Sequence, residues 1–340
     1  MNRWLAALPI EASVALYLLV YLPNVILTRL ATAEANPQLA RRLTGLEILP
    51  ASLIISLVLT YAFIWLSGWY RDAHRAPFGS ARFPLPTRWT LVSGVGTALI
   101  LFTVPLSFTI QNVSIPFIQL LMRGDILIIA PLVDTVFGRR VRWWSWVALA
   151  MVMTALLITL FDRGGLRLPA IAVVTVALYT LGYFLRLFVM TKVSKSGDPA
   201  SVRAYFVEEK IVALPLAVAV LALLSALGLG GQSGELRFGF VQVWSDPVIW
   251  PIAWIALTLT VLSVLSIVIL LDARENAYCV PLERAASLIA GVGGAMLMAW
   301  VWGQKMPRAS ELVGAAILIA AIFVLSLAPR LSARSARAPA

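Results

Sequence analysis

Apolar residues in this chain gather into long stretches, and polar residues concentrate in the segments between them. A helix that crosses a bilayer needs about 20 mostly apolar residues. Read by that length, the sequence contains ten candidate spans, at about residues 10–28, 46–67, 89–109, 113–136, 143–161, 168–190, 207–229, 247–271, 277–302 and 309–329. The pattern therefore predicts an all-α membrane protein with ten transmembrane helices.

The second half of the chain repeats features of the first half. The segment Val14-Ala15-Leu16-Tyr17-Leu18-Leu19-Val20-Tyr21 returns 162 residues later, from Val176 to Tyr183, with six of its eight positions identical. Pro116 precedes Gly138 by 22 residues, and Pro281 precedes Gly303 by the same 22. We expect two five-helix repeats at 10–161 and 168–329, followed by a disordered basic tail at 330–340. Because five is an odd number, the second repeat enters the membrane upside down, and such inverted repeats are typical of transporters.

Composition supports membrane insertion and excludes several kinds of site. Of the 340 residues, 61% are hydrophobic and 13% are charged, whereas soluble domains carry about 25% charged residues. One cysteine, Cys279, and one histidine, His74, exclude a disulfide framework and a His/Cys metal cluster. We therefore expect no metal and no cofactor. The net charge of +11 is spread over the segments between spans, so we expect a bilayer and a small molecule as partners rather than nucleic acid.

The basic residues predict an orientation. With both termini in the cytoplasm, the inside segments hold 15 Lys and Arg residues and the outside loops hold eight. Basic residues favour the cytoplasmic side of membrane proteins, so we expect cytoplasmic termini and a bacterial inner membrane location. The bias is moderate, because the loop at 29–45 carries three arginines on the outer side.

Short motifs add a resemblance to a known family. Phe137-Gly138-Arg139-Arg140 precedes the fifth span, and Trp302-Gly303-Gln304-Lys305 precedes the last one. With ten spans and a 5+5 repeat, this resembles the drug/metabolite transporter superfamily, in particular its EamA-type domains. The acidic residue that follows the glycine in that family is absent from both copies. The segment from Ala277 to Arg284 is also similar to the ninth helix of triose-phosphate and nucleotide-sugar translocators, where a Lys-Arg pair contacts substrate phosphate. Glu283 stands in the lysine position, so the resemblance transfers a substrate contact to Arg284 alone.

Two polar-aromatic stripes are the leading candidates for a substrate site. Tyr17, Tyr21 and Asn24 are spaced i, i+4, i+7, which puts them on one helix face. Tyr179, Tyr183 and Arg186 repeat this spacing in the second half. Polar groups within a bilayer need partners, and the resemblance implies that these two helices line a central cavity. The alternative is that both stripes only pack against neighbouring helices.

Three further residues are predicted to bind substrate from the fourth span. Gln119 and Arg123 share a helix face, and Asp125 lies about 200° around the helix from Arg123. An arginine near the midplane is costly and often functional. By contrast, we interpret Glu208-Glu209-Lys210 as the interfacial start of the seventh span.

These patterns favour a secondary active transporter that moves a small polar metabolite, such as an organic anion, by alternating access. The chain contains no nucleotide-binding motif and no HExxH or GxSxG sequence, so we expect no enzyme activity. A flippase for a lipid-linked headgroup and a multidrug or amino-acid exporter are the alternatives. The sequence leaves the oligomeric state open, and a homodimer is one alternative. The substrate, the coupling ion and the direction of transport are not specified by the sequence.

Overall fold

A computed structural model of the 340-residue chain provides the coordinates. It describes residues 10–33, 35–36, 39, 41–78, 81–110, 113, 117–118, 120–122, 129, 143–162, 169–193, 198–228, 233–272 and 276–335. Most of the fourth expected span, at 113–136, lies outside the described residues. All structural statements below concern the described part of the chain.

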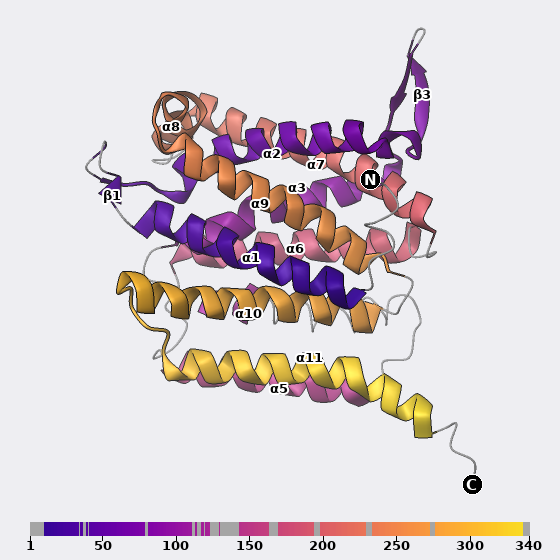
Figure 1. Cartoon of the computed structure of the whole chain (residues 1–340), viewed down its shortest axis with the longest axis vertical. Helices are drawn as coiled ribbons and strands as arrows, with labels where there is room; N and C mark the ends of the chain where they lie inside the picture. Colours follow the sequence, from indigo (N-terminus) through magenta and orange to yellow (C-terminus); the bar gives the residue numbers. More distant parts are fainter. Residues whose placement is uncertain are drawn as a thin grey trace.

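Helices dominate the structure and follow the apolar stretches (Figure 1). The long helices are α1 (Ile10–Ala33), α2 (Gly45–Ser67), α3 (Arg88–Thr109), α5 (Trp143–Asp162), α6 (Ala170–Val193), α7 (Pro199–Leu227), α9 (Ile249–Leu270), α10 (Asn276–Trp302) and α11 (Ala309–Ser335). The shorter elements are β1 (Ala35–Asn36), β2 (Arg41–Arg42), η1 (Trp69–Arg71), β3 (Arg75–Phe78), β4 (Ala81–Pro84), α8 (Ser233–Val241) and η2 (Gln242–Ser245). Each long helix coincides with one of the expected spans.

The composition and surface of these helices fit a multi-pass membrane protein. Within the described residues, six helices are long and apolar enough to cross a membrane: Ile10–Thr32, Gly45–Ser67, Ala170–Val193, Pro199–Leu227, Ile249–Leu270 and Leu282–Trp302. Large apolar side chains also point outward, with Trp300 85% and Phe161 80% exposed. Contact of such side chains with lipid tails costs no free energy, whereas their contact with water is unfavourable.

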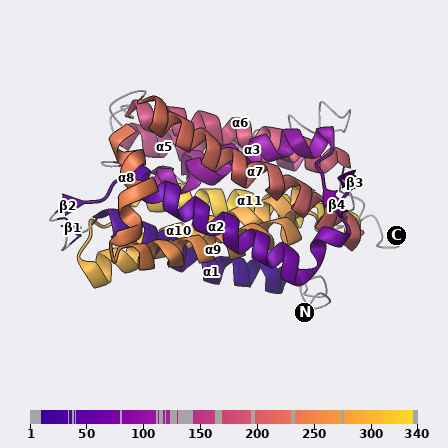
Figure 2. The same cartoon turned by 90° about the horizontal axis from the view of Figure 1, so that it is seen from above.

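Helix packing pairs elements from the two halves of the chain. α3 packs against α6 and α7, and in the same manner α9 packs against α1 and α2. α5 lies along α11 in a layer at one edge of the bundle, beside α10 (Figures 1 and 2). Contacts between distant segments therefore hold the two halves together.

The contact between α3 and α6 depends on two glycines. A Cβ atom added at Gly96 would stand 2.7 Å from the Gly182 carbonyl oxygen, and one added at Gly182 would stand 2.6 Å from the Gly96 carbonyl oxygen. The two backbones thus touch at one crossing point, which only small residues permit.

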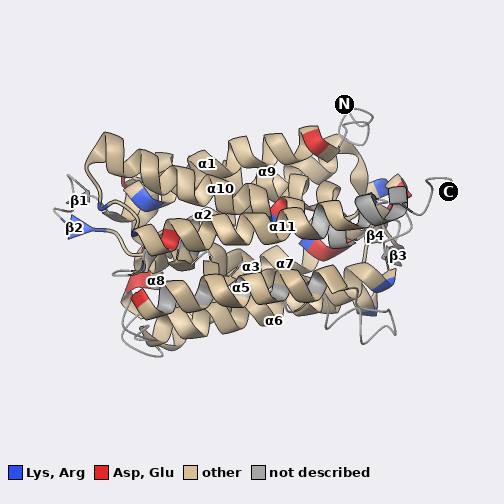
Figure 3. Cartoon of the chain, turned by 90° about the horizontal axis from the view of Figure 1, so that it is seen from below, with Lys and Arg blue, Asp and Glu red and all other residues tan. Residues whose placement is uncertain are grey.

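The two ends of the bundle carry different elements. Figure 1 shows the start of α1, the end of α11 and the β3–β4 hairpin at one end, and the β1–β2 hairpin with α8 at the other. Most Lys, Arg, Asp and Glu residues lie near these ends, and few lie along the middle (Figure 3). The loop at 29–45 was expected, but the strands of both hairpins were not.

Two helix boundaries differ from the sequence expectation. α7 begins at Pro199, eight residues before the expected 207, because Asp198 caps it by accepting hydrogen bonds from the Ala200 and Ser201 amides. α11 continues to Ser335, past the expected start of a disordered tail at 330. Alanine and arginine favour helix in this segment, and arginine is favourable at a helix C-terminus.

Single cysteines test which loops share a side of the membrane. We expect Arg75→Cys in β3 and Arg237→Cys in α8 to be labelled from opposite sides, because both side chains are exposed and lie at opposite ends of the bundle. The measurement is labelling by an impermeant maleimide in sealed vesicles, in a Cys279→Ser background that removes the buried native thiol. Labelling of both positions from one side would contradict this arrangement.

Alanine substitutions test the glycine crossing. We expect Gly96→Ala to lower the free energy of unfolding by about 1–3 kcal/mol, because the new methyl group meets backbone rather than a movable side chain. Gly293→Ala in α10 is the matched control, since its Cβ would meet nothing closer than Leu22 Cδ1 at 3.9 Å. The measurement is thermal unfolding in detergent. Equal melting temperatures for the two variants would refute a close backbone contact.

Candidate functional site

A polar cavity of about 70 Å³ lies inside the bundle. Its walls come from α1, α3, α6, α7, α9 and α10, so both halves of the chain contribute. Its polar lining residues are Tyr17, Tyr21, Asn24, Thr97, Tyr183, Arg186, Lys210, Ser263, Ser266 and Glu283. This is the candidate substrate site.

The two predicted stripes meet at this cavity. The rings of Tyr17 and Tyr21 contact each other on α1 in a tilted arrangement with 5.5 Å between centroids, and those of Tyr179 and Tyr183 do so on α6 with 4.9 Å between centroids. Tyr179 is fully buried and does not line the cavity, but it is in ring contact with Tyr183, which does. The predicted positions therefore converge in space, and their role in binding stays a prediction.

Each stripe ends in a residue that joins its helix to a neighbour. On α1, the Asn24 Nδ2 group donates to Thr258 Oγ1 at 2.8 Å and to the Ile255 carbonyl at 3.2 Å, both on α9. On α6, the Arg186 Nε group donates to Glu209 Oε1 of α7 at 2.9 Å. Asn24 and Arg186 are 4% and 5% exposed, so both positions use a buried polar contact to fix the helix that carries the tyrosines.

Glu209 is the centre of a buried hydrogen-bond cluster. Besides Arg186, its Oε1 atom accepts from Thr97 Oγ1 at 2.5 Å, Ser93 Oγ at 3.2 Å and the Tyr205 hydroxyl at 3.3 Å. These donors come from α3, α6 and α7. A carboxylate buried this deeply is tolerated only when cations and donors surround it, so the cluster explains why Glu209 lies inside the bundle.

Lys210 borders the cavity beside this cluster. Its Nζ atom lies 3.8 Å from Glu209 Oε2, and the residue is 2% exposed. Within the described part of the chain, the ammonium makes no hydrogen bond, although it carries three N–H donors. Lys210 is thus a buried cation in the lining of the cavity, with hydrogen-bond donors that the described residues leave unused.

A second charged pair lies on α10. The Ser266 hydroxyl of α9 donates to Glu283 Oε1 at 2.8 Å, and Arg284 Nη2 lies 3.0 Å from Glu283 Oε2. Arg284 also donates to the Tyr179 hydroxyl at 2.8 Å, with its guanidinium carbon 3.9 Å from the Tyr183 ring centroid. Arg284 therefore supports both tyrosines of α6 without itself lining the cavity.

The structure corrects the interpretation of Glu208-Glu209-Lys210 as an interfacial segment. Because α7 begins at Pro199, Glu209 and Lys210 lie about three turns inside the helix and are buried. Glu208 faces the hairpin root instead, where it accepts hydrogen bonds from the His74 amide at 3.1 Å and the Thr90 hydroxyl at 2.9 Å. The Asp198-Pro199 pair, a helix cap followed by proline, is the sequence signal that locates the true start.

The remaining expectations have different outcomes. Gln119, Arg123 and Asp125 lie outside the described residues. Among the described residues, no group of three His, Cys, Asp or Glu side chains could hold a metal ion. Glu209 and Glu283 pair with Arg186 and Arg284, so the surroundings of the cavity are less positive than these arginines alone would make them, and the organic anion stays a prediction. Lys210 is the cation that the sequence interpretation missed.

Comparisons with known proteins give information on the fold. No protein-family model and no curated protein matches the sequence. Among solved structures, one described only as a crystal structure of a protein matches 93% of this chain and 98% of that chain, with a TM-score of 0.55 and 16% identity. At this identity the likeness concerns the fold alone, over nearly the whole length of both chains.

Charge removal tests the Glu209 cluster. We expect Glu209→Gln to cost about 3–5 kcal/mol of stability, because it leaves Arg186 and Lys210 buried without a carboxylate partner. Arg186→Gln should cost less, since Lys210 stays beside Glu209. Thermal unfolding in detergent measures both.

Asp72→Asn is the matched control for this comparison. Asp72 pairs with Arg203 at 2.5 Å, but the two side chains are 29% and 25% exposed, so its loss should cost under about 1 kcal/mol. A loss for Glu209→Gln no larger than that of the control would show that the buried charges do not depend on Glu209.

Proposed function

We propose that this chain is a secondary active transporter of the drug/metabolite transporter superfamily, similar to EamA-type proteins. The observation that carries the proposal is the polar cavity, which both halves line through equivalent stripes on α1 and α6. Transporters with inverted repeats bind substrate at the interface between the repeats, near the bilayer midplane. The chemistry of the proposed substrate is that of a small polar metabolite.

Helix pairing supports the inverted repeat within this proposal. α3 contacts α6 and α7 as α9 contacts α1 and α2, and α2–α7 and α5–α11 contact each other directly. A two-fold relation between 10–161 and 168–329 would generate this set of contacts. It would also put the β3–β4 hairpin and α8, which follow α2 and α7, at opposite ends, in agreement with Figure 1. With the excess of basic residues, the orientation we propose has both termini in the cytoplasm of a bacterial inner membrane.

The charges around the cavity indicate which substrates would bind. Among the described residues, the cations near the cavity outnumber the acids by one. The cations are Arg186, Lys210 and Arg284, and the acids are Glu209 and Glu283. Lys210 is the lysine among the described residues that line the cavity. A carboxylate or a similar singly charged anionic group would pair with Lys210 and offset this charge, so the proposed substrate carries one such group.

The size of the cavity supports alternating access. A cavity of about 70 Å³ is well below the roughly 300–1,000 Å³ typical of ligand pockets. We therefore expect the helices to move apart as a metabolite of several heavy atoms enters. The contact between α1 and α9 and that between α3 and α6 are the natural places for this motion, because each joins opposite halves beside the cavity.

Ligand stabilisation tests the proposal. Purified protein is screened by thermal shift against small carboxylates, amino acids and phosphorylated metabolites, and each hit is tested for uptake into proteoliposomes. We expect a monoanionic compound to stabilise the protein and to be transported. Lys210→Met should abolish both effects, because Lys210 is the one lysine among the described residues that line the cavity.

Lys192→Met is the control for this experiment. Lys192 lies in the last turn of α6 with its ammonium 3.8 Å from the centroid of the Trp89 ring, and it does not line the cavity. It should leave ligand stabilisation and uptake unchanged. Binding and transport that survive in Lys210→Met would refute the assigned site, and transport of a lipid-linked headgroup alone would favour a flippase.

A further inference from the structure

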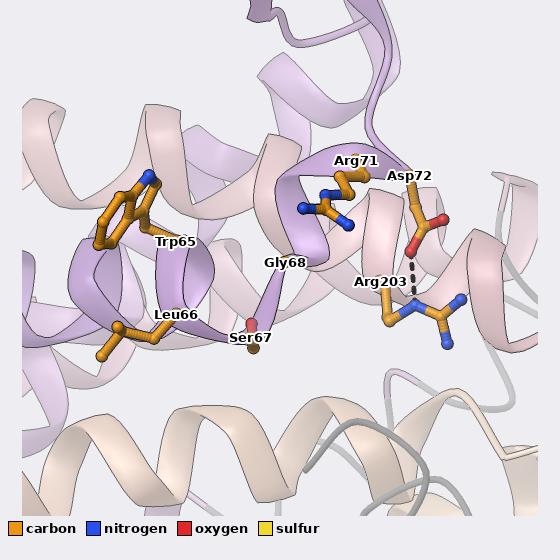
Figure 4. Close-up of a pocket in the computed structure, with 7 residues that line it drawn as sticks. All are labelled: Trp65, Leu66, Ser67, Gly68, Arg71, Asp72 and Arg203. Atoms are coloured by element: carbon orange, nitrogen blue, oxygen red, sulfur yellow. Dashed lines mark hydrogen bonds and ion pairs between the residues drawn. The ribbon is translucent and has the colours of Figure 1, made fainter.

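A larger cleft, of about 520 Å³, lies at the end of the bundle where α2 stops (Figure 4). One part of its wall is the last turn of α2, with Trp65 and Leu66. The other part comes from the segment after α2, with Arg71 and Asp72, and from Arg203 near the start of α7. The cleft is separate from the polar cavity described above, with which it shares no lining residue.

The apolar wall of the cleft is exposed. Trp65 and Leu66 are 72% and 71% exposed, although they belong to a helix that is long and apolar enough to cross a membrane. Side chains in the last turn of such a helix lie where the acyl chains meet the headgroups, and tryptophan is enriched at that depth. The part of the cleft next to α2 is therefore suited to lipid.

Gly68 brings the charged wall close to the apolar wall. It caps α2 with φ of 74°, in the left-handed region, and its amide donates to the Trp65 carbonyl at 3.2 Å. This conformation is easy only for glycine. The chain turns directly into η1, so Arg71 follows Trp65 by less than two helical turns. Figure 4 shows the guanidinium of Arg71 pointing back toward the end of α2.

The guanidinium groups have donors free for an anion. Arg71 Nε donates only a long hydrogen bond of 3.4 Å to the Tyr70 hydroxyl, which lowers the pKa of that phenol. Arg203 uses its Nε in the pair with Asp72. Within the described part of the chain, the four terminal nitrogens of these two arginines make no hydrogen bond. Arg75, whose guanidinium carbon lies 5.7 Å from the centroid of the Tyr70 ring, adds positive charge next to the cleft.

We propose that this cleft binds the phosphate headgroup of an anionic phospholipid. Guanidinium groups bind phosphate oxygens through paired N–H donors, and Trp65 and Leu66 contact the glycerol and acyl portion. The cleft lies at the same end as the start of α1 and the end of α11. That end is the one for which the basic residues predict a cytoplasmic location, and the cytoplasmic leaflet is the one rich in anionic lipid.

A soluble phosphate compound is the rival ligand, and the apolar wall argues against it. The exposed side chains of Trp65 and Leu66 would gain nothing from a small hydrated anion, whereas a lipid covers them with hydrocarbon. The two ligands therefore differ in whether binding depends on Trp65 and Leu66, and this difference decides between them.

The experiment measures lipid binding to the purified full-length protein by native mass spectrometry and by thermal shift. Phosphatidylglycerol, phosphatidylcholine and inorganic phosphate are compared in the same detergent. We expect phosphatidylglycerol to bind more tightly than phosphatidylcholine, and inorganic phosphate to have no effect. Arg71→Gln should weaken phosphatidylglycerol binding about fivefold, the effect of removing about one basic residue at an anionic surface. Arg71 is chosen because, among the described residues, it has no carboxylate partner that its loss would leave unpaired.

Two further variants complete the test. Trp65→Ala combined with Leu66→Ala should weaken phosphatidylglycerol binding as well, since both side chains are exposed and their loss leaves the core intact. Arg237→Gln is the control and should have no effect, because Arg237 is an exposed residue of α8 at the other end of the bundle.

The proposal is wrong if Arg71→Gln binds phosphatidylglycerol as the unmodified protein does, if Arg237→Gln weakens binding equally, or if inorganic phosphate alone stabilises the protein through Arg71. None of these outcomes depends on whether the chain transports a metabolite.

Discussion

The need to neutralise charge inside an apolar bundle governs the interior of this protein. Glu209 lies fully buried among helices whose outer surfaces are apolar, and its carboxylate is surrounded by Arg186, Lys210 and three hydroxyl groups. Neither the acid nor the cations would be tolerated there alone, because desolvation of an unpaired ion costs several kcal/mol. The cluster thus requires α3, α6 and α7 to be together before any of its charges is stable.

The close crossing of α3 and α6 makes this cluster possible. Gly96 and Gly182 let the two backbones touch, and Thr97, the neighbour of Gly96, then reaches Glu209. In lipid, where helices gain no hydrophobic energy from association, such close packing and interhelical hydrogen bonds supply most of the attraction. Asn24 has a corresponding role between α1 and α9, with a neutral amide in place of an ion pair. The two residues that end the stripes, Asn24 and Arg186, thus hold their helices by a neutral hydrogen bond in one case and by an ion pair in the other.

This asymmetry gives the cavity its polarity. The α1 wall contributes two tyrosines and an amide, whereas the walls from α6, α7 and α10 contribute ions. Most of these ions satisfy one another, so the cavity is less strongly positive than its arginines alone would suggest. Lys210 is the exception, since it lines the cavity and, among the described residues, its ammonium has only a 3.8 Å contact to Glu209. The proposed site would therefore select its ligand chiefly through Lys210.

Sequence by itself determined the helical class, the positions of most spans and the two stripes of Tyr17–Tyr21 and Tyr179–Tyr183. These features depend on local quantities, namely the length of apolar runs and the helical period, which can be read without knowing the neighbours. Span boundaries were less certain, as the early start of α7 illustrates: Arg203 and Glu208 precede the long apolar run, yet the capped helix continues through them. The fourth span, with Gln119, Arg123 and Asp125, was predicted from the same local signals but lies outside the described residues.

Only the tertiary structure decided which charges pair and which face the cavity. Glu209 and Lys210 are adjacent in sequence and looked interfacial, but their burial depends on where α3 and α6 lie. Likewise, nothing local indicates that Arg284 supports Tyr179 and Tyr183 from a helix more than 100 residues away. Pairing is a property of distances between helices, and the sequence contains no direct record of those distances. For that reason the positions of the stripes could be predicted, whereas the electrostatic character of the site could not.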